Sequence, residues 1–127
     1  MTQDYAEILK WYRKAAEQGY ARAQHNLGMM YRDGEGVPRD YAEALKWFRK
    51  AAVQGNAKAQ TNLGIMYVLG IGVPEDYVKA HMWFSLAKAE GHEGAAKSLD
   101  LVKKQMKTDQ ISEAQKLAPE RLEKHNN

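Results

Sequence analysis

The sequence predicts an all-α solenoid, because one helical unit recurs along the chain. Residues 40–74 are a near copy of residues 4–38, and a third, decaying copy begins at Asp76, so the offset is 36 residues each time. Each copy holds two stretches of helical periodicity separated by a short glycine turn. A repeat of this kind buries its apolar face only against its neighbours, and about three units are needed for stability. The 127 residues contain three.

The first unit is predicted to contain helices over residues 4–18 and 21–32. Asp4 suits the N-cap of the first helix, and Gly19 suits its end. Apolar residues of this helix fall on one face, at Tyr5, Ile8, Tyr12, Ala15 and Ala16. The segment GEGVP at residues 34–38 then ends the unit, since glycine and proline interrupt helices.

The second unit repeats this plan, with helices predicted over residues 41–54 and 57–69. Gly28 and Gly64 lie in the middle of the second helices, where glycine costs about 1 kcal/mol relative to alanine. Their presence indicates close approach by a helix or ring of the next unit. In the third unit, residues 76–107, Asp100 replaces this glycine, so we expect the array to end there.

The last segment, residues 108–127, is predicted to be a capping helix that seals the array. Thr108 suits its N-cap, and its apolar residues are Ile111, Ala114, Leu117 and Ala118. Pro119 is expected to kink or split this helix, because its ring removes an amide donor and crowds the previous turn. The whole chain, residues 1–127, is then a single repeat domain.

The repeated motifs resemble the Sel-one-like repeat (SLR) family, which is related to the tetratricopeptide repeats. They are AEALKWFRKAAVQG, AKAQTNLGIMY and a GxGVPxDY break, and the resemblance covers about residues 4–101. It implies antiparallel helix pairs stacked in a right-handed α/α superhelix whose concave face, lined by the second helices, binds proteins or peptides. Members are commonly bacterial or eukaryotic adaptors. A cysteine-rich branch is linked to cell-wall or β-lactam chemistry, but this chain has no cysteine.

Composition excludes several classes of protein and of site. The absence of cysteine excludes disulfides, zinc–thiolate sites and cysteine nucleophiles. A net charge of +3 is small beside the clustered basic surface of a nucleic-acid binder. No apolar stretch approaches the roughly 20 residues of a membrane span. With no signal peptide visible, the cytoplasm is favoured, and export of a processed or longer form is left open.

The two good copies differ at ten of 35 positions, and five of these differences lie on one face of the second helix. At about 100° per residue they span an arc of roughly 100°. Variation restricted to one face indicates that repeat packing does not specify it. The second copy offers apolar residues there, which favours a contact surface over neutral drift. Packing against an adjacent unit or a second molecule is the alternative.

The predicted partner-binding face consists of these varied residues together with neighbouring polar ones. Asn26 and Asn62 are identical in both copies. Because asparagine is a mediocre helix former, its repetition indicates a specific role. With Arg22, Lys58 and Lys97 they are expected to form a polar track for an acidic or C-terminal peptide, an inter-unit hydrogen bond being the alternative. The full set is Arg22, His25, Asn26, Met29, Arg32, Lys58, Thr61, Asn62, Ile65, Val68, Leu69 and Lys97.

No catalytic, metal or cofactor site is predicted. The four histidines are scattered without metal-ligand spacing, and the GxG segments lack the strand and full glycine pattern of a phosphate loop. The expected function is therefore non-catalytic binding of a protein or peptide, as a scaffold or adaptor. The alternatives are a self-associating structural fragment of a longer array and an enzyme of the cell-wall or β-lactam type.

Overall fold

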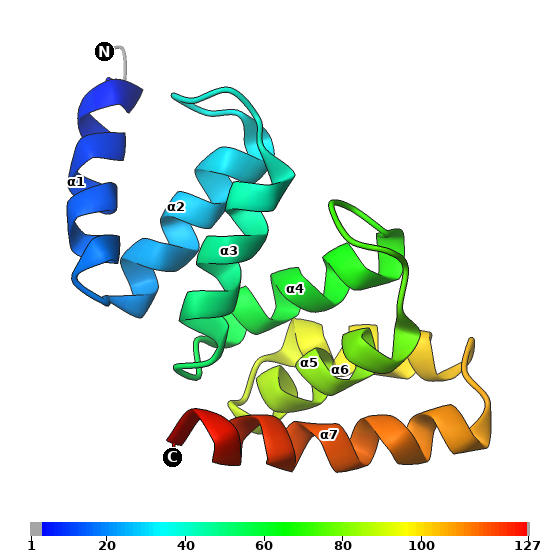
Figure 1. Ribbon diagram of the computed structural model, residues 1–127. Coiled ribbons are helices and arrows are strands. Elements are labelled where there is room, and N and C mark those ends of the chain that lie inside the picture. The colour runs from blue at the N-terminus through cyan, green and yellow to red at the C-terminus, as the bar shows by residue number, and fades with distance from the viewer. Residues whose placement is uncertain (1–3, 127) are drawn as a thin grey trace.

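A computed structural model describes the backbone of residues 4–126 and the side chains of residues 4–118. This part of the chain is all helical (Figure 1). In chain order the helices are α1 (Tyr5–Glu17), α2 (Ala21–Asp33), α3 (Tyr41–Ala52), α4 (Ala57–Leu69), α5 (Tyr77–Ala89), α6 (Glu93–Lys103) and α7 (Thr108–Asn126). The predicted all-α repeat fold is confirmed.

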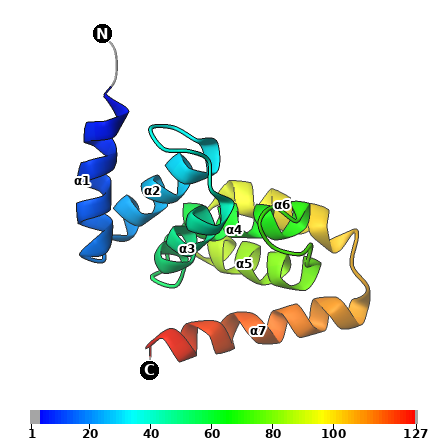
Figure 2. The same ribbon diagram turned by 45° about the horizontal axis from the view of Figure 1, so that its top comes forward.

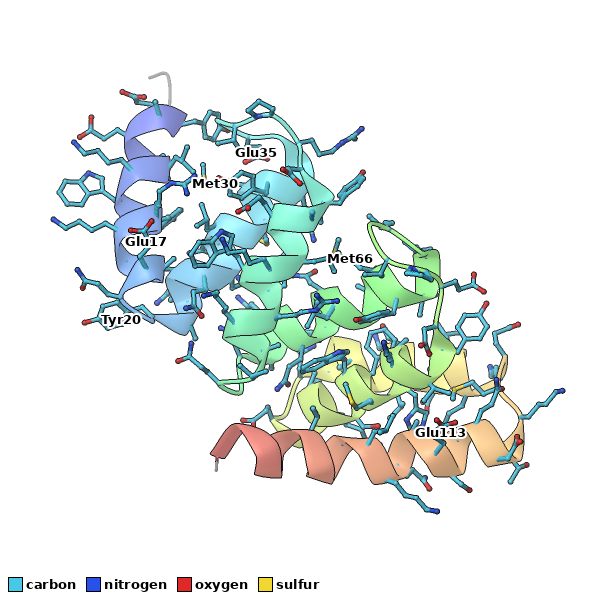
Figure 3. All side chains as sticks on the ribbon, in the orientation of Figure 1. Glu17, Tyr20, Met30, Glu35, Met66 and Glu113 are labelled. Carbon is cyan, nitrogen blue, oxygen red and sulfur yellow. The ribbon has the colours of Figure 1, made fainter. Side chains whose placement is uncertain are left out.

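Three helix pairs, α1–α2, α3–α4 and α5–α6, stack one after another (Figure 1, Figure 2). An aspartate caps the first helix of each pair as the sequence predicts. The carboxylates of Asp4, Asp40 and Asp76 accept hydrogen bonds from the backbone N–H three residues later at 3.3, 3.1 and 3.0 Å. Gly34 and Gly70 end α2 and α4 in the left-handed conformation, with φ of +70° and +66°.

Within a pair, a buried glutamine of the second helix bonds the end of the first helix. The Gln24 and Gln60 side-chain amides donate to the carbonyls of Ala16 and Ala52, at 3.1 and 3.0 Å. These carbonyls lie at the ends of α1 and α3, where helices leave acceptors unsatisfied. The same hydrogen bond therefore links the two helices of the pair in both copies.

Between pairs, the mid-helix glycines receive an aromatic ring from the next unit, as predicted. A Cβ at Gly28 would lie 2.7 Å from Cδ1 of Phe48 on α3, and one at Gly64 only 2.4 Å from Cε1 of Phe84 on α5. The glycines therefore admit the rings that join successive pairs. Asp100, at the same position of α6, is exposed, so no aromatic ring among the described residues covers it.

The last helix, α7, packs against α5, with Ala114 and Ala118 buried. The split expected at Pro119 does not occur: α7 runs as one helix from Thr108 to Asn126 (Figure 1). A proline withdraws one donor, and the carbonyl it leaves belongs to Gln115, which is exposed and available to water. The helix therefore continues.

Candidate functional site

The second helices α2, α4 and α6 carry the predicted partner-binding residues. We call the surface that they form the second-helix surface. Two hollows lie on it. One is lined largely by polar side chains from the beginnings of the helices. The other is lined largely by apolar side chains from the ends of α4 and α6 and from α5. They are called the polar pocket and the apolar pocket below.

The polar pocket measures 520 Å³ and holds five of the predicted residues. Arg22 and Lys58 are exposed at its edge, Asn26 and Met29 are half-buried, and His25 is buried. The turns before α4 and α6 complete it with Asn56, Glu90, Gly91 and His92, which sequence reasoning did not select. Asn56 and His92 are the N-caps of their helices, so their sequence signal is a capping role and not a binding one.

The apolar pocket measures 320 Å³ and gathers Ile65, Val68 and Leu69 of α4. The predicted apolar residues of the second unit thus lie together. Leu69 is 61% exposed, and Leu101, which faces the same pocket from α6, is 63% exposed. Leu101 occupies the position of Ile65 in the third unit, and alignment of that decayed copy is the signal that would have found it.

Asn62 is held by two residues of the preceding unit. Its amide nitrogen lies 3.1 Å from Nε2 of His25, and its oxygen accepts a hydrogen bond from Nη1 of Arg32 at 3.0 Å. Arg32 is itself paired with Asp33 at 2.9 Å. For Asn62 the structure therefore places the inter-unit hydrogen bond that the sequence left as the alternative to a ligand contact.

His25 and Thr61, which occupy equivalent positions, both make contacts between units. Thr61 Oγ1 donates to the carbonyl of Ala57 at 2.9 Å and lies 3.2 Å from Nδ1 of His92. Burial lowers the pKa of His25 below its ordinary value, and Lys58 and Arg32 lower it further, against a hydrogen bond with Asn26 that raises it. The imidazole is therefore neutral near pH 7, and Arg22 and Lys58 supply the positive charge of the pocket.

The remaining predicted residue, Lys97, is exposed on α6 and does not line either pocket. Among residues 4–118, no group of three His, Asp or Glu side chains is placed to hold a metal ion. Likewise, none of the described helices is long and apolar enough to cross a membrane.

The decisive comparison is with protein families, since a Sel1 repeat model matches residues 1–20, 21–56 and 57–92. The chain belongs to the Sel1 repeat family. Each complete match begins at a second helix and includes the first helix of the next pair, so it spans the glycine–phenylalanine contact described above. Sel1 repeats commonly mediate protein–protein interaction.

Two solved structures of repeat proteins share this fold. One is c5321, a protective antigen of uropathogenic Escherichia coli that displays an SLR fold, with a TM-score of 0.92 and 34% identity. The match covers 98% of this chain and 27% of c5321. A Sel1 repeat protein from Oxalobacter formigenes matches with a TM-score of 0.76 and 40% identity, over 80% of this chain and 42% of that one.

Curated relatives share only a short part of the chain. DAP3-binding cell death enhancer 1 of Rattus norvegicus and of Mus musculus is 42% identical over 38 residues. This stretch is 30% of the present chain and 8% of either relative. The chain thus spans a small part of the curated relatives it matches.

Proposed function

We propose that this Sel1 repeat protein is a non-catalytic scaffold whose second-helix surface binds an extended segment of a partner protein. The observation that carries the proposal is the pairing of a basic polar pocket with an exposed apolar pocket along α4. Exposed apolar side chains gathered in a hollow are typical of binding sites.

The spacing of the two pockets defines the partner segment. Lys58 and Leu69 stand at opposite ends of α4, eleven residues apart, which corresponds to about 16 Å along a helix. An extended peptide covers this distance in about five residues. The proposed partner therefore carries an acidic side chain or a terminal carboxylate about five residues from an apolar side chain.

Nine of the twelve predicted residues have a defined part in this proposal. Arg22 and Lys58 receive the carboxylate, and Asn26, which also bonds His25, contacts the peptide backbone. Ile65, Val68 and Leu69 receive the apolar side chain. The contacts already made by His25, Thr61 and Asn62 suggest that they hold the surface rigid, which lowers the entropic cost of binding.

Selection from a random peptide library with free C-termini tests this function, with the purified full chain as bait. We expect enrichment of peptides that combine an acidic group with an apolar residue at about this spacing. The affinity of an enriched peptide should fall at least tenfold in Ile65→Asp/Leu69→Asp, because the apolar pocket would then carry charge.

A matched charge reversal separates a specific site from general attraction. Arg22→Glu/Lys58→Glu should lower the affinity for the same peptide, whereas Lys10→Glu/Lys14→Glu on α1 should leave that affinity unchanged. Circular dichroism establishes that each variant is folded. Unchanged affinity in folded Ile65→Asp/Leu69→Asp and Arg22→Glu/Lys58→Glu would contradict the proposal.

Self-association is the second candidate, favoured by the exposure of Leu69 and Leu101 in one pocket. Light scattering over a range of concentrations distinguishes the two. A dimer that dissociates in Ile65→Asp/Leu69→Asp would assign the apolar pocket to a second copy. A monomer at high concentration would leave it to a different partner.

A further inference from the structure

Helix α7 covers one face of α5, and the equivalent face of α3 is exposed. Met82 and Leu86 on α5 are 3% and 6% exposed, whereas Lys46 and Lys50, the residues 36 positions earlier, are exposed. Helices α4 and α6 pack on α5 as α2 and α4 pack on α3, so these neighbours do not account for the difference. Helix α7 accounts for the difference, because it packs on α5. Among the described residues 4–126, no helix packs on α3 in the equivalent way.

An open groove lies on this uncovered side, between α1 and α3. It measures 660 Å³, and α3 contributes Lys46, Trp47 and Lys50 to it. These are the positions that correspond to Met82, Trp83 and Leu86 on α5. From the opposite side α1 contributes Arg13 and Glu17.

This groove carries two lysines where the α5 face carries apolar residues, whereas a buried tryptophan is present in both. Trp47 and Trp83 are 4% and 1% exposed. The ammonium groups of Lys46 and Lys50 lie 5.1 and 5.4 Å from the centre of the Trp47 ring. Both ammonium groups therefore lie close to this indole on the exposed side of α3.

We propose that the groove between α1 and α3 is a second docking site, which binds an acidic amphipathic helix in the way that α5 binds α7. Among the side chains of α7 that the structure describes, residues 108–118, the buried ones are Ala114 and Ala118, one turn apart, which lets the two helices approach closely. Ile111 and Leu117 lie beside them, half-buried. A partner for the α1–α3 groove keeps the small residues and replaces these aliphatic residues by Glu or Asp, which pair with Lys46 and Lys50.

A synthetic peptide of residues 108–126 carrying Ile111→Glu and Leu117→Glu is the probe. Fluorescence anisotropy measures its binding to the full-length chain at low ionic strength. We expect saturable binding that weakens with added salt and falls about tenfold in Lys46→Glu/Lys50→Glu. Lys10→Glu/Lys14→Glu is the matched control, because these lysines occupy the same positions on α1 and do not line the groove.

A second variant reverses the preference. Lys46→Met/Lys50→Leu gives α3 the residues of α5, and it should bind the unsubstituted 108–126 peptide better than the glutamate peptide. Absence of saturable binding of the glutamate peptide to the wild type would overturn the proposal. So would an equal loss of affinity in the Lys10/Lys14 control, or tighter binding of the unsubstituted peptide to the wild type, which would assign the groove to α7 of a second copy.

Discussion

The mid-helix glycines are the residues on which the stacking of this array depends most directly. Phe48 and Phe84 are fully buried against Gly28 and Gly64, so each ring occupies the space that a side chain would need. The sequence predicted this contact because a repeated glycine inside a helix has a cost that packing must offset. It did not identify the ring, since many aromatic residues of the next unit were available.

Substitution of Gly64 tests this packing. Gly64→Ala should lower the free energy of unfolding by about 1–3 kcal/mol, because the new methyl group would lie 2.4 Å from Cε1 of Phe84. Chemical denaturation measures the change, and Gly64→Ala/Phe84→Leu should recover much of it. A gain of about 1 kcal/mol in Gly64→Ala, as helix propensity alone predicts, would contradict the account.

His81 is a buried residue at a position where the other units carry leucine. It is 2% exposed, its Nδ1 lies 3.2 Å from Oγ of Ser85, and its Nε2 is buried without a hydrogen-bond partner among the described residues. Burial lowers its pKa below the ordinary value of 6.5, and Lys103 lowers it further. Leu9 and Leu45 occupy the same position in the first two units.

His81→Leu should therefore stabilise the protein by about 1 kcal/mol at pH 7, because it removes an unpaired buried nitrogen. Below pH 6.5 the unfolded chain binds a proton that the buried imidazole does not, so the wild type loses stability as the pH is lowered. The gain from His81→Leu should therefore grow at low pH. Thermal unfolding at pH 7.5 and 5.5 measures both effects. An equal or smaller difference between the two proteins at pH 5.5 would show that His81 does not titrate as argued.

At the level of the helix, α7 is the element for which sequence reasoning was least complete. Its existence was predicted from its own periodicity, but its position against α5 was not. The signal was present on α5 itself, where Met82 and Leu86 replace two lysines of the repeat. Decay of the third copy predicts the end of the array, but it does not by itself predict which helix packs on α5.

Removal of α7 tests whether it covers this face. A chain ending at residue 107 should lose about 3 kcal/mol or more of unfolding free energy and aggregate, because Met82 and Leu86 become exposed. Met82→Lys/Leu86→Lys in the shortened chain should restore solubility, since these are the residues that α3 carries. Light scattering and thermal unfolding measure the result. A shortened chain as stable and soluble as the complete one would show that α7 is dispensable.

Across the whole molecule, the identical positions serve mainly to build the array. The residues shared by the copies, such as the caps, Gln24 and Gln60, and the mid-helix glycines, build and stack the helix pairs. The varied stripe on α2 and α4 lies along both pockets, and its role in binding stays a prediction. Turn residues such as Glu90 and His92 were not predicted from the sequence, because their proximity to α2 depends on the stacking of the units.

The stripe also contains residues that hold the units together, and sequence periodicity does not separate these from residues free to bind. His25 and Arg32 reach across to Asn62, whereas Ile65 and Leu69 on the same stripe face open space. Helical phase gives the direction of a side chain, but the neighbour it meets is set by the three-dimensional arrangement. The proposed binding role therefore depends on the exposed residues of the stripe.

Chemical-shift mapping of a selected peptide on the isotope-labelled full chain is the most direct test of the second-helix surface as the binding site. We predict that the perturbed amides cluster on α2, α4 and α6 along the line from Lys58 to Leu69, and that the perturbations vanish in folded Ile65→Asp/Leu69→Asp. Perturbations confined to α1, α3 and α5, or unchanged in that variant, would contradict the account.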